Sequence, residues 1–129
     1  MQPQHQNFHL EGVQHISPRE AFEQLINNKA LLIDVRDKEE YEVERIGLAN
    51  VKHCPMTEIV DRLEDLPKDI LLITMDTLGE RGTKVANLLN MQQFPRVANL
   101  DGGIIRWKEE NLPVEDILPD ACDGCCGCS

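Results

Sequence analysis

The hydrophobic pattern of the chain alternates between short continuous apolar runs and amphipathic segments. Continuous runs at 31–35, 70–75 and 97–100 are typical of strands that are buried on both faces of a parallel sheet. Shorter apolar stretches at 13–16 and 51–54 predict two further strands. Because amphipathic segments separate these runs, the pattern predicts an α/β fold with a parallel sheet of about five strands and helices on both faces.

Several amphipathic segments carry helix start signals. Ser17-Pro18-Arg19-Glu20 combines an N-cap, a proline in the first turn and an acidic residue at the third position, so we expect a helix that ends near Asn27-Asn28. Two shorter helices are expected over 37–43 and over 57–63, the second with Thr57 as its cap.

A six-residue loop joins the strand at 70–75 to a helix. Its sequence is Asp76-Thr77-Leu78-Gly79-Glu80-Arg81, and the helix has apolar residues at the i, i+3, i+4 positions Val85, Leu88 and Leu89. Such a loop directs backbone N–H groups inward, and the helix N-terminus adds partial positive charge. Arg81 adds a full charge. The pattern therefore predicts that residues 77–82 bind an anion and that a nucleophile would lie at position 76, the first residue of the loop.

Three motifs follow one another along the chain and carry a resemblance. They are Leu31-Leu32-Ile33-Asp34-Val35-Arg36 followed by Glu40-Tyr41, the loop with Gly79 and Arg81, and Asn99-Leu100-Asp101-Gly102-Gly103 followed by a helix with Trp107; His53-Cys54-Pro55 also fits. Together they resemble the rhodanese-like domain, a sulfurtransferase family related to a group of phosphatases. The resemblance covers roughly residues 13 to 115 and implies a rhodanese fold with its active site in the loop.

The loop departs from the family at its most important position. The family's persulfide-forming Cys falls on Asp76, and the Ser or Thr after the loop falls on Gly82. A carboxylate cannot hold a persulfide, so sulfur transfer through this position is excluded. We expect the loop N–H groups and Arg81 to lower the pKa of Asp76. The ionised carboxylate of Asp76 would then occupy the space that an incoming anion would take. An aspartyl-phosphate nucleophile and a vestigial site on a structural scaffold are the alternatives.

Composition limits the classes of partner. The chain has 129 residues and a net charge of −10, from 13 basic and 23 acidic residues, which argues against nucleic acid and anionic membranes as partners. Its apolar runs are too short for a membrane span. The polar segment 1–8 does not read as a secretory signal, so a cytoplasmic location is expected. We expect a disordered segment over 1–12, one domain over 13–115, and a linker with a Cys-rich tail over 116–129.

The tail is the second candidate site. Four of the five cysteines, Cys122, Cys125, Cys126 and Cys128, lie in the last eight residues, with glycines between them. Four thiolates suit zinc, Cu(I) or an iron–sulfur cluster, although adjacent Cys125 and Cys126 are awkward around a single metal ion. A thiol or persulfide carrier and a disordered tail without a site are the alternatives.

Other reactive residues have simpler interpretations. Cys54 occupies an apolar position and is expected in the core. Asp34 is expected in a structural ion pair, whereas the family resemblance implies that it organises neighbouring loops and that Arg36 lies near the active-site mouth. His5 and His9 could chelate a metal only if their segment were helical.

Three functions remain open at this point. The leading hypothesis is a binding or regulatory module that handles metal or sulfur through its tail, with a small anion or a sulfur-relay protein as partner. The alternative is a sulfurtransferase that uses tail cysteines as sulfur carriers. The third is a scaffold without chemistry.

Overall fold

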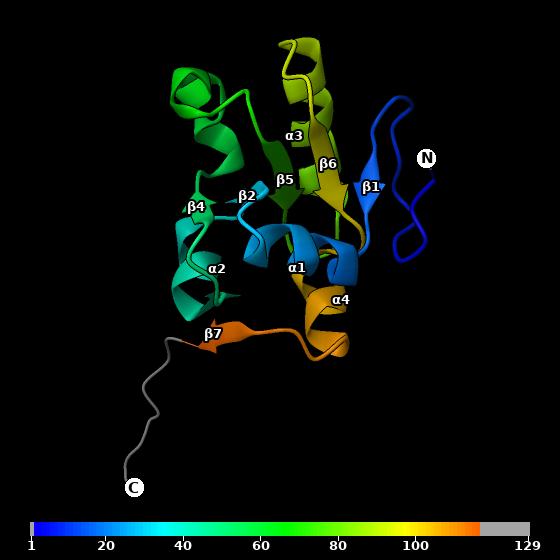
Figure 1. Cartoon of the computed structure of the whole chain (residues 1–129), viewed down its shortest axis with the longest axis vertical. Coiled ribbons are helices and arrows are strands. Elements are labelled where there is room, and N and C mark those ends of the chain that lie inside the picture. The colour runs from blue at the N-terminus through cyan, green and yellow to red at the C-terminus, as the bar shows by residue number, and fades with distance from the viewer. Residues whose placement is uncertain (1, 117–129) are drawn as a thin grey trace, which may run out of the picture.

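Residues 2–116, which this computed structural model describes, fold around a five-stranded sheet (Figure 1). Its strands are β1 (His15–Ile16), β6 (Val97–Leu100), β5 (Leu71–Met75), β2 (Ala30–Asp34) and β4 (Val51–His53), in this spatial order. All four neighbouring pairs are parallel. The predicted α/β class and the five-stranded parallel sheet are confirmed.

Helices cover both faces of this sheet. Helices α1 (Pro18–Ile26) and α4 (Gly103–Glu109) pack on the near face in Figure 1. Helix α3 (Glu80–Met91) and the 3₁₀ segments η1 (Met56–Glu58) and η2 (Val60–Asp65) pack on the far face. Each face therefore has its own apolar cluster, as expected for strands that are buried on both sides.

Two local features differ from the sequence-based expectations. The α-helix predicted over 57–63 is instead the pair of 3₁₀ turns, and Pro55 rather than Thr57 stands at their start. Pro67 fixes Leu66 in extended geometry, so little length is left for a regular helix. The small antiparallel pair of β3 (Glu44–Ile46) and β7 (Val114–Asp116) was also not predicted, because both segments are short and β7 is exposed.

The N-terminal segment differs most from expectation. Instead of a disordered lead-in, residues 4–6 lie against the carboxyl end of β6 and the start of α4. The backbone N–H groups of Gln4 and His5 donate to the carboxylate of Asp101, at 2.7 and 2.9 Å. Polar hydrogen bonds rather than an apolar stripe hold this segment, so the hydrophobic pattern gives no sign of it.

Among the described residues, no helix is both long enough and apolar enough to cross a membrane. Helix α2 (Lys38–Val43) follows β2 and precedes β3 along the chain, and none of its residues is buried. The predicted tail over 116–129 lies outside the described residues except for Asp116.

Candidate functional site at the β5–α3 loop

The loop after β5 folds around the side chain of Asp76. Gly79 adopts φ of +115° and caps α3, which starts at Glu80, one residue before the end of the predicted loop. This geometry directs the N–H of Arg81 to Oδ2 of Asp76, at 2.8 Å. Asp76 is only 2% exposed, so its carboxyl group occupies the interior of the loop rather than pointing to solvent.

The protonation of Asp76 differs from the sequence-based expectation. Burial raises the pKa of Asp76 above its ordinary value, and this effect outweighs the N–H groups of Arg81, Gly82 and Gly79 and the charge of Arg81, which lower the pKa. Its Oδ1 atom is buried without a hydrogen-bond partner among the described residues. The predicted lowering was wrong because desolvation of a buried carboxylate exceeds the stabilisation that a few N–H donors supply.

Arg81 is turned away from the loop interior. Its guanidinium forms two parallel hydrogen bonds with the carboxylate of Glu40, on α2, at 2.8 and 3.0 Å. The closest approach of Arg81 Nε to Asp76 Oδ2 is 3.6 Å. These bonds lower the pKa of Glu40 to about 2. Glu40 belongs to a motif that the sequence singled out, but the sequence did not indicate that it would pair with Arg81.

The turn before α4 presses against the loop. Ile104 and Ile105 donate their backbone N–H groups to the carbonyls of Asp76 and Thr77, at 2.9 and 3.2 Å. Gly103 has φ of +66°, and a side chain there would overlap these two carbonyls. Gly103 is thus explained by the close approach of the helix start to the loop.

Gln6 is a site residue that the sequence did not reveal. Its side-chain amide donates to the carbonyl of Gly79 at 3.3 Å and to Oγ1 of Thr83 at 3.0 Å. Its Oε1 atom accepts the N–H of Gly102 at 2.9 Å and the side-chain amide of Asn99 at 3.1 Å. One glutamine from the N-terminal segment therefore links the loop, α3, β6 and the start of α4.

The remaining loop residues differ in exposure and in their hydrogen-bond partners. Leu78 is 63% exposed, and Thr77 donates its hydroxyl to Glu40 at 3.0 Å. Glu80 pairs with Lys84 on the surface. Gly82 faces both Asp76 Oδ1 and Asn99 Oδ1, and the latter is also buried without a partner in the described chain. The loop interior is therefore filled by the chain's own carboxyl group.

The structural interpretations of other residues are confirmed. Asp34 and Arg36 form a buried ion pair at 2.8 Å, and Arg36 also donates to the carbonyl of Glu44. Cys54 is fully buried, and burial raises the pKa of its thiol.

The segment that carries His5 and His9 is not helical, so the condition for chelation by this pair is not met. His9 contacts His15 instead, at 2.9 Å, and the described residues contain no cluster of three or more potential metal ligands. Cys122, Cys125, Cys126 and Cys128 lie outside the described residues.

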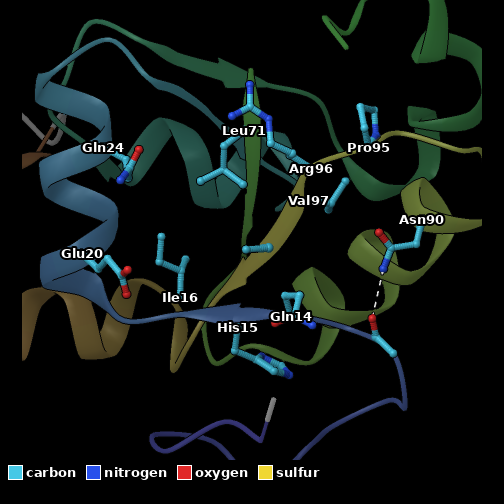
Figure 2. A pocket seen from close by; sticks show the side chains of 12 residues that line it. Gln14, His15, Ile16, Glu20, Gln24, Leu71, Asn90, Pro95, Arg96 and Val97 are labelled. Carbon is cyan, nitrogen blue, oxygen red and sulfur yellow. Dashed lines mark hydrogen bonds between the residues drawn. The ribbon is translucent and has the colours of Figure 1, made fainter. Parts of the chain in front are cut away.

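A cavity of about 640 Å³ lies away from the loop, beside the short strand β1 (Figure 2). Its floor includes Ile16, Leu71 and Val97, and Glu20 and Gln24 of α1 line one side. Strand β1 spans only two residues, so the beginning of β6 has no strand beside it on this edge. Among the described residues that line the cavity, none carries a thiol and none belongs to the loop over 76–82.

Comparison with known proteins assigns the chain to a class. The rhodanese-like domain family matches residues 17–110. The chain belongs to this family.

Particular relatives are sulfurtransferases. The chain is 33% identical over 101 residues to the thiosulfate sulfurtransferase GlpE of Coxiella burnetii, which covers 78% of this chain and 92% of the relative. It is 32% identical over 84 residues to a sulfurtransferase of Allochromatium vinosum, covering 65% of this chain and 77% of that protein.

Solved structures agree with this assignment. A rhodanese-like domain protein of Staphylococcus aureus superposes with a TM-score of 0.67 at 28% identity, covering 74% of this chain and 91% of that one. A rhodanese-related protein of Thermoplasma volcanium superposes with a TM-score of 0.68 at 24% identity, covering 79% and 97%, and shows the shared fold.

Proposed function

We propose that this protein transfers sulfane sulfur through the cysteines of its tail, while the loop at Asp76 carries no sulfur. Two observations support the proposal. The relatives are sulfurtransferases, and the interior of the loop is filled by the buried carboxyl group of Asp76.

The loop is poorly suited to an anionic sulfur donor. Arg81, the cation of the loop, is held by Glu40 through two hydrogen bonds. The N–H of Arg81, which would otherwise face an incoming anion, already donates to Asp76. A dianion such as thiosulfate would meet two carboxyl groups against one guanidinium, so electrostatic repulsion would oppose binding.

Sulfur transfer needs an accessible thiolate, and the chain offers few candidates. The thiol of Cys54 is fully buried with a raised pKa, which makes it unreactive. The remaining thiols are Cys122, Cys125, Cys126 and Cys128. By elimination, a sulfur-carrying thiolate of this protein belongs to the tail.

The proposed step is a simple displacement. A tail thiolate attacks the outer sulfur of thiosulfate, an S–S bond forms, and the original S–S bond breaks as sulfite leaves with the electron pair. The product is a cysteine persulfide anion, and a thiolate of an acceptor protein then takes the terminal sulfur in the same way. No additional oxidant or reductant is required.

Anaerobic intact-mass spectrometry of the full chain tests the proposal, before and after incubation with thiosulfate or a protein persulfide. We expect a gain of one or more sulfur atoms that maps to the tail. The variant with all four tail cysteines changed to Ser should lose this gain, whereas Cys54→Ala should keep it. No gain with either donor, or a gain that maps to Cys54, would overturn the proposal.

A metal-binding module is the second candidate, because four thiols separated by glycines match the ligand number of zinc, Cu(I) and iron–sulfur clusters. Native mass spectrometry of the same samples distinguishes the two functions. A metal-loaded mass that is lost in the four-Ser variant, together with no sulfur uptake, would support the metal-binding function instead.

A further inference from the structure

We propose that the segment 117–129 docks in cis on a cationic pocket between α2, β4 and the 3₁₀ turns. The pocket has a volume of about 390 Å³. The residues that line it include Lys38, Tyr41, Arg45, His53, Pro55 and Arg62. This inference does not depend on whether the tail cysteines carry sulfur, because it rests on the position, charge and shape of the pocket.

The pocket lies where the described chain ends. Strand β7 pairs with β3 so that Glu115 lies opposite Arg45 and Asp116 opposite Glu44, the residue directly after α2. Arg45 holds Glu115 at 2.9 Å and also lines the pocket. In Figure 1, β7 runs below the molecule toward α2. The chain therefore leaves β7 at the border of the pocket.

The pocket is less acidic than the rest of the protein. Three cations, Lys38, Arg45 and Arg62, line it together with two carboxylates, Glu42 and Glu58, in a chain whose net charge is −10. Lys38 and Arg62 are only loosely paired, with Glu42 at 3.9 Å and Glu58 at 3.3 Å, through largely exposed side chains. Exposed pairs of this kind contribute about 0–1 kcal/mol, so another carboxylate can replace the partner at little cost.

One wall of the pocket is a flat stack of rings. The rings of Tyr41 and His53 lie nearly parallel, with centroids 4.2 Å apart, and the guanidinium of Arg45 lies over the Tyr41 ring, 4.7 Å from its centroid. A hydrogen bond of 2.9 Å between His53 Nε2 and the carbonyl of Arg36 fixes the stack. The pocket therefore has a preformed aromatic side as well as cations.

The composition of the tail complements these features. The segment 117–129 contains Asp120 and Asp123 and no Lys or Arg, and it begins with the apolar residues Ile117-Leu118-Pro119. Four residues beyond Asp116, a fully extended chain reaches about 13 Å, which is enough to cross the pocket. The apolar start fits the aromatic wall, and the two carboxylates fit Lys38 and Arg62.

Docking would bring the tail close to the β5–α3 loop. Asp34 of β2 is paired with His53 on one side and with Met75, the residue before Asp76, on the other. Neighbouring strands lie about 4.8 Å apart, so the backbone of His53 and the start of the loop are separated by about 10 Å. Tail cysteines docked here would lie at the same edge of the sheet as the family's reaction centre.

Zero-length carbodiimide crosslinking of the full chain tests the inference, with the products mapped by mass spectrometry. A docked tail should join Asp120 or Asp123 to Lys38 in the monomer. A tail that is merely tethered at Asp116 should instead favour Lys108, which holds Glu44 at 2.9 Å beside the exit point. A preference for Lys108, or equal yields at both lysines, would overturn the inference.

Matched charge variants isolate the role of the pocket. Arg62→Glu should reduce the yield at Lys38 about threefold, the effect of one surface ion pair. Arg96→Glu, directly before β6 and in the lining of a different cavity, should leave the yield unchanged. A mixture of light and ¹⁵N-labelled chains detects crosslinks between molecules. A predominance of mixed products would mean that a second copy, not the chain's own tail, occupies the pocket and would refute docking in cis.

Discussion

Replacement of Asp76 by Asn should stabilise the protein at neutral pH. The substitution keeps the shape of the side chain and removes a charge from the buried loop, where burial raises the pKa of Asp76. Oδ1 of the new amide would accept the N–H of Arg81, as Oδ2 does now. Its NH₂ group would lie beside Gly82, which Asn99 Oδ1, an acceptor without a partner among residues 2–116, also borders, and we expect the two groups to pair.

One favourable and two unfavourable contributions set the magnitude. Providing a donor for a buried, unsatisfied acceptor contributes about 1–3 kcal/mol. Against this, the bond from Arg81 loses its charge assistance, about 1 kcal/mol, and a 3.6 Å contact with a guanidinium whose side chain is 32% exposed contributes less than about 1 kcal/mol. We therefore expect a net gain of about 1 kcal/mol, or about 4 °C in Tm.

Urea unfolding measured by the fluorescence of Trp107, the only tryptophan and fully buried, provides the assay. The pH dependence carries the decisive information. Because the folded-state pKa of Asp76 is raised, wild type loses stability as pH rises from the unfolded-state value toward the folded one. The advantage of Asp76→Asn should therefore be smallest below about pH 4 and largest at pH 7.

The opposite result would refute this reasoning. If Asp76→Asn were less stable than wild type at pH 7 and the deficit disappeared in acid, the loop would be stabilising an ionised carboxylate, as the sequence alone suggested. Asp76→Ala is the control for shape. It leaves the N–H of Arg81 without its acceptor and should be less stable than Asp76→Asn at every pH.

Three further predictions concern the supports of the loop. Gln6→Ala should lower the free energy of unfolding by about 2 kcal/mol, because it removes five side-chain hydrogen bonds. Gln4→Ala should have no measurable effect in the same urea titration. Gly103→Ala should lower the free energy of unfolding by about 3 kcal/mol or more, since it adds steric overlap to a positive φ. Gly12→Ala, at a positive φ in open space, should lower it by only about 1 kcal/mol. Equal losses in the two variants would contradict the close approach of Gly103 to the loop. Glu40→Gln should lower the free energy of unfolding by about 1 kcal/mol at pH 7. Because the folded-state pKa of Glu40 is about 2, this loss should persist above about pH 4.5 and vanish as the pH falls through about 2. A loss that does not depend on pH would refute the ion pair as its cause.

The main elements of the fold could be predicted from local sequence. Continuous apolar runs indicated the buried strands, and Ser17 with Pro18 indicated the start of α1, where the Ser17 hydroxyl does accept the N–H of Glu20. These signals are local, since strand burial and helix capping depend on neighbouring residues. The 3₁₀ turns after Pro55 were missed because two prolines, rather than the apolar spacing, limit that segment.

The sequence by itself also determined what the loop cannot do. An aspartate at position 76 excludes a loop persulfide in any conformation, because the required atom is absent. Only the tertiary structure decided the protonation of that aspartate, the engagement of Arg81 by Glu40, and the role of Gln6, which lies 73 residues from Gly79 in the chain. Desolvation and long-range hydrogen bonds depend on which segments meet in space, and no local pattern of residues encodes that meeting.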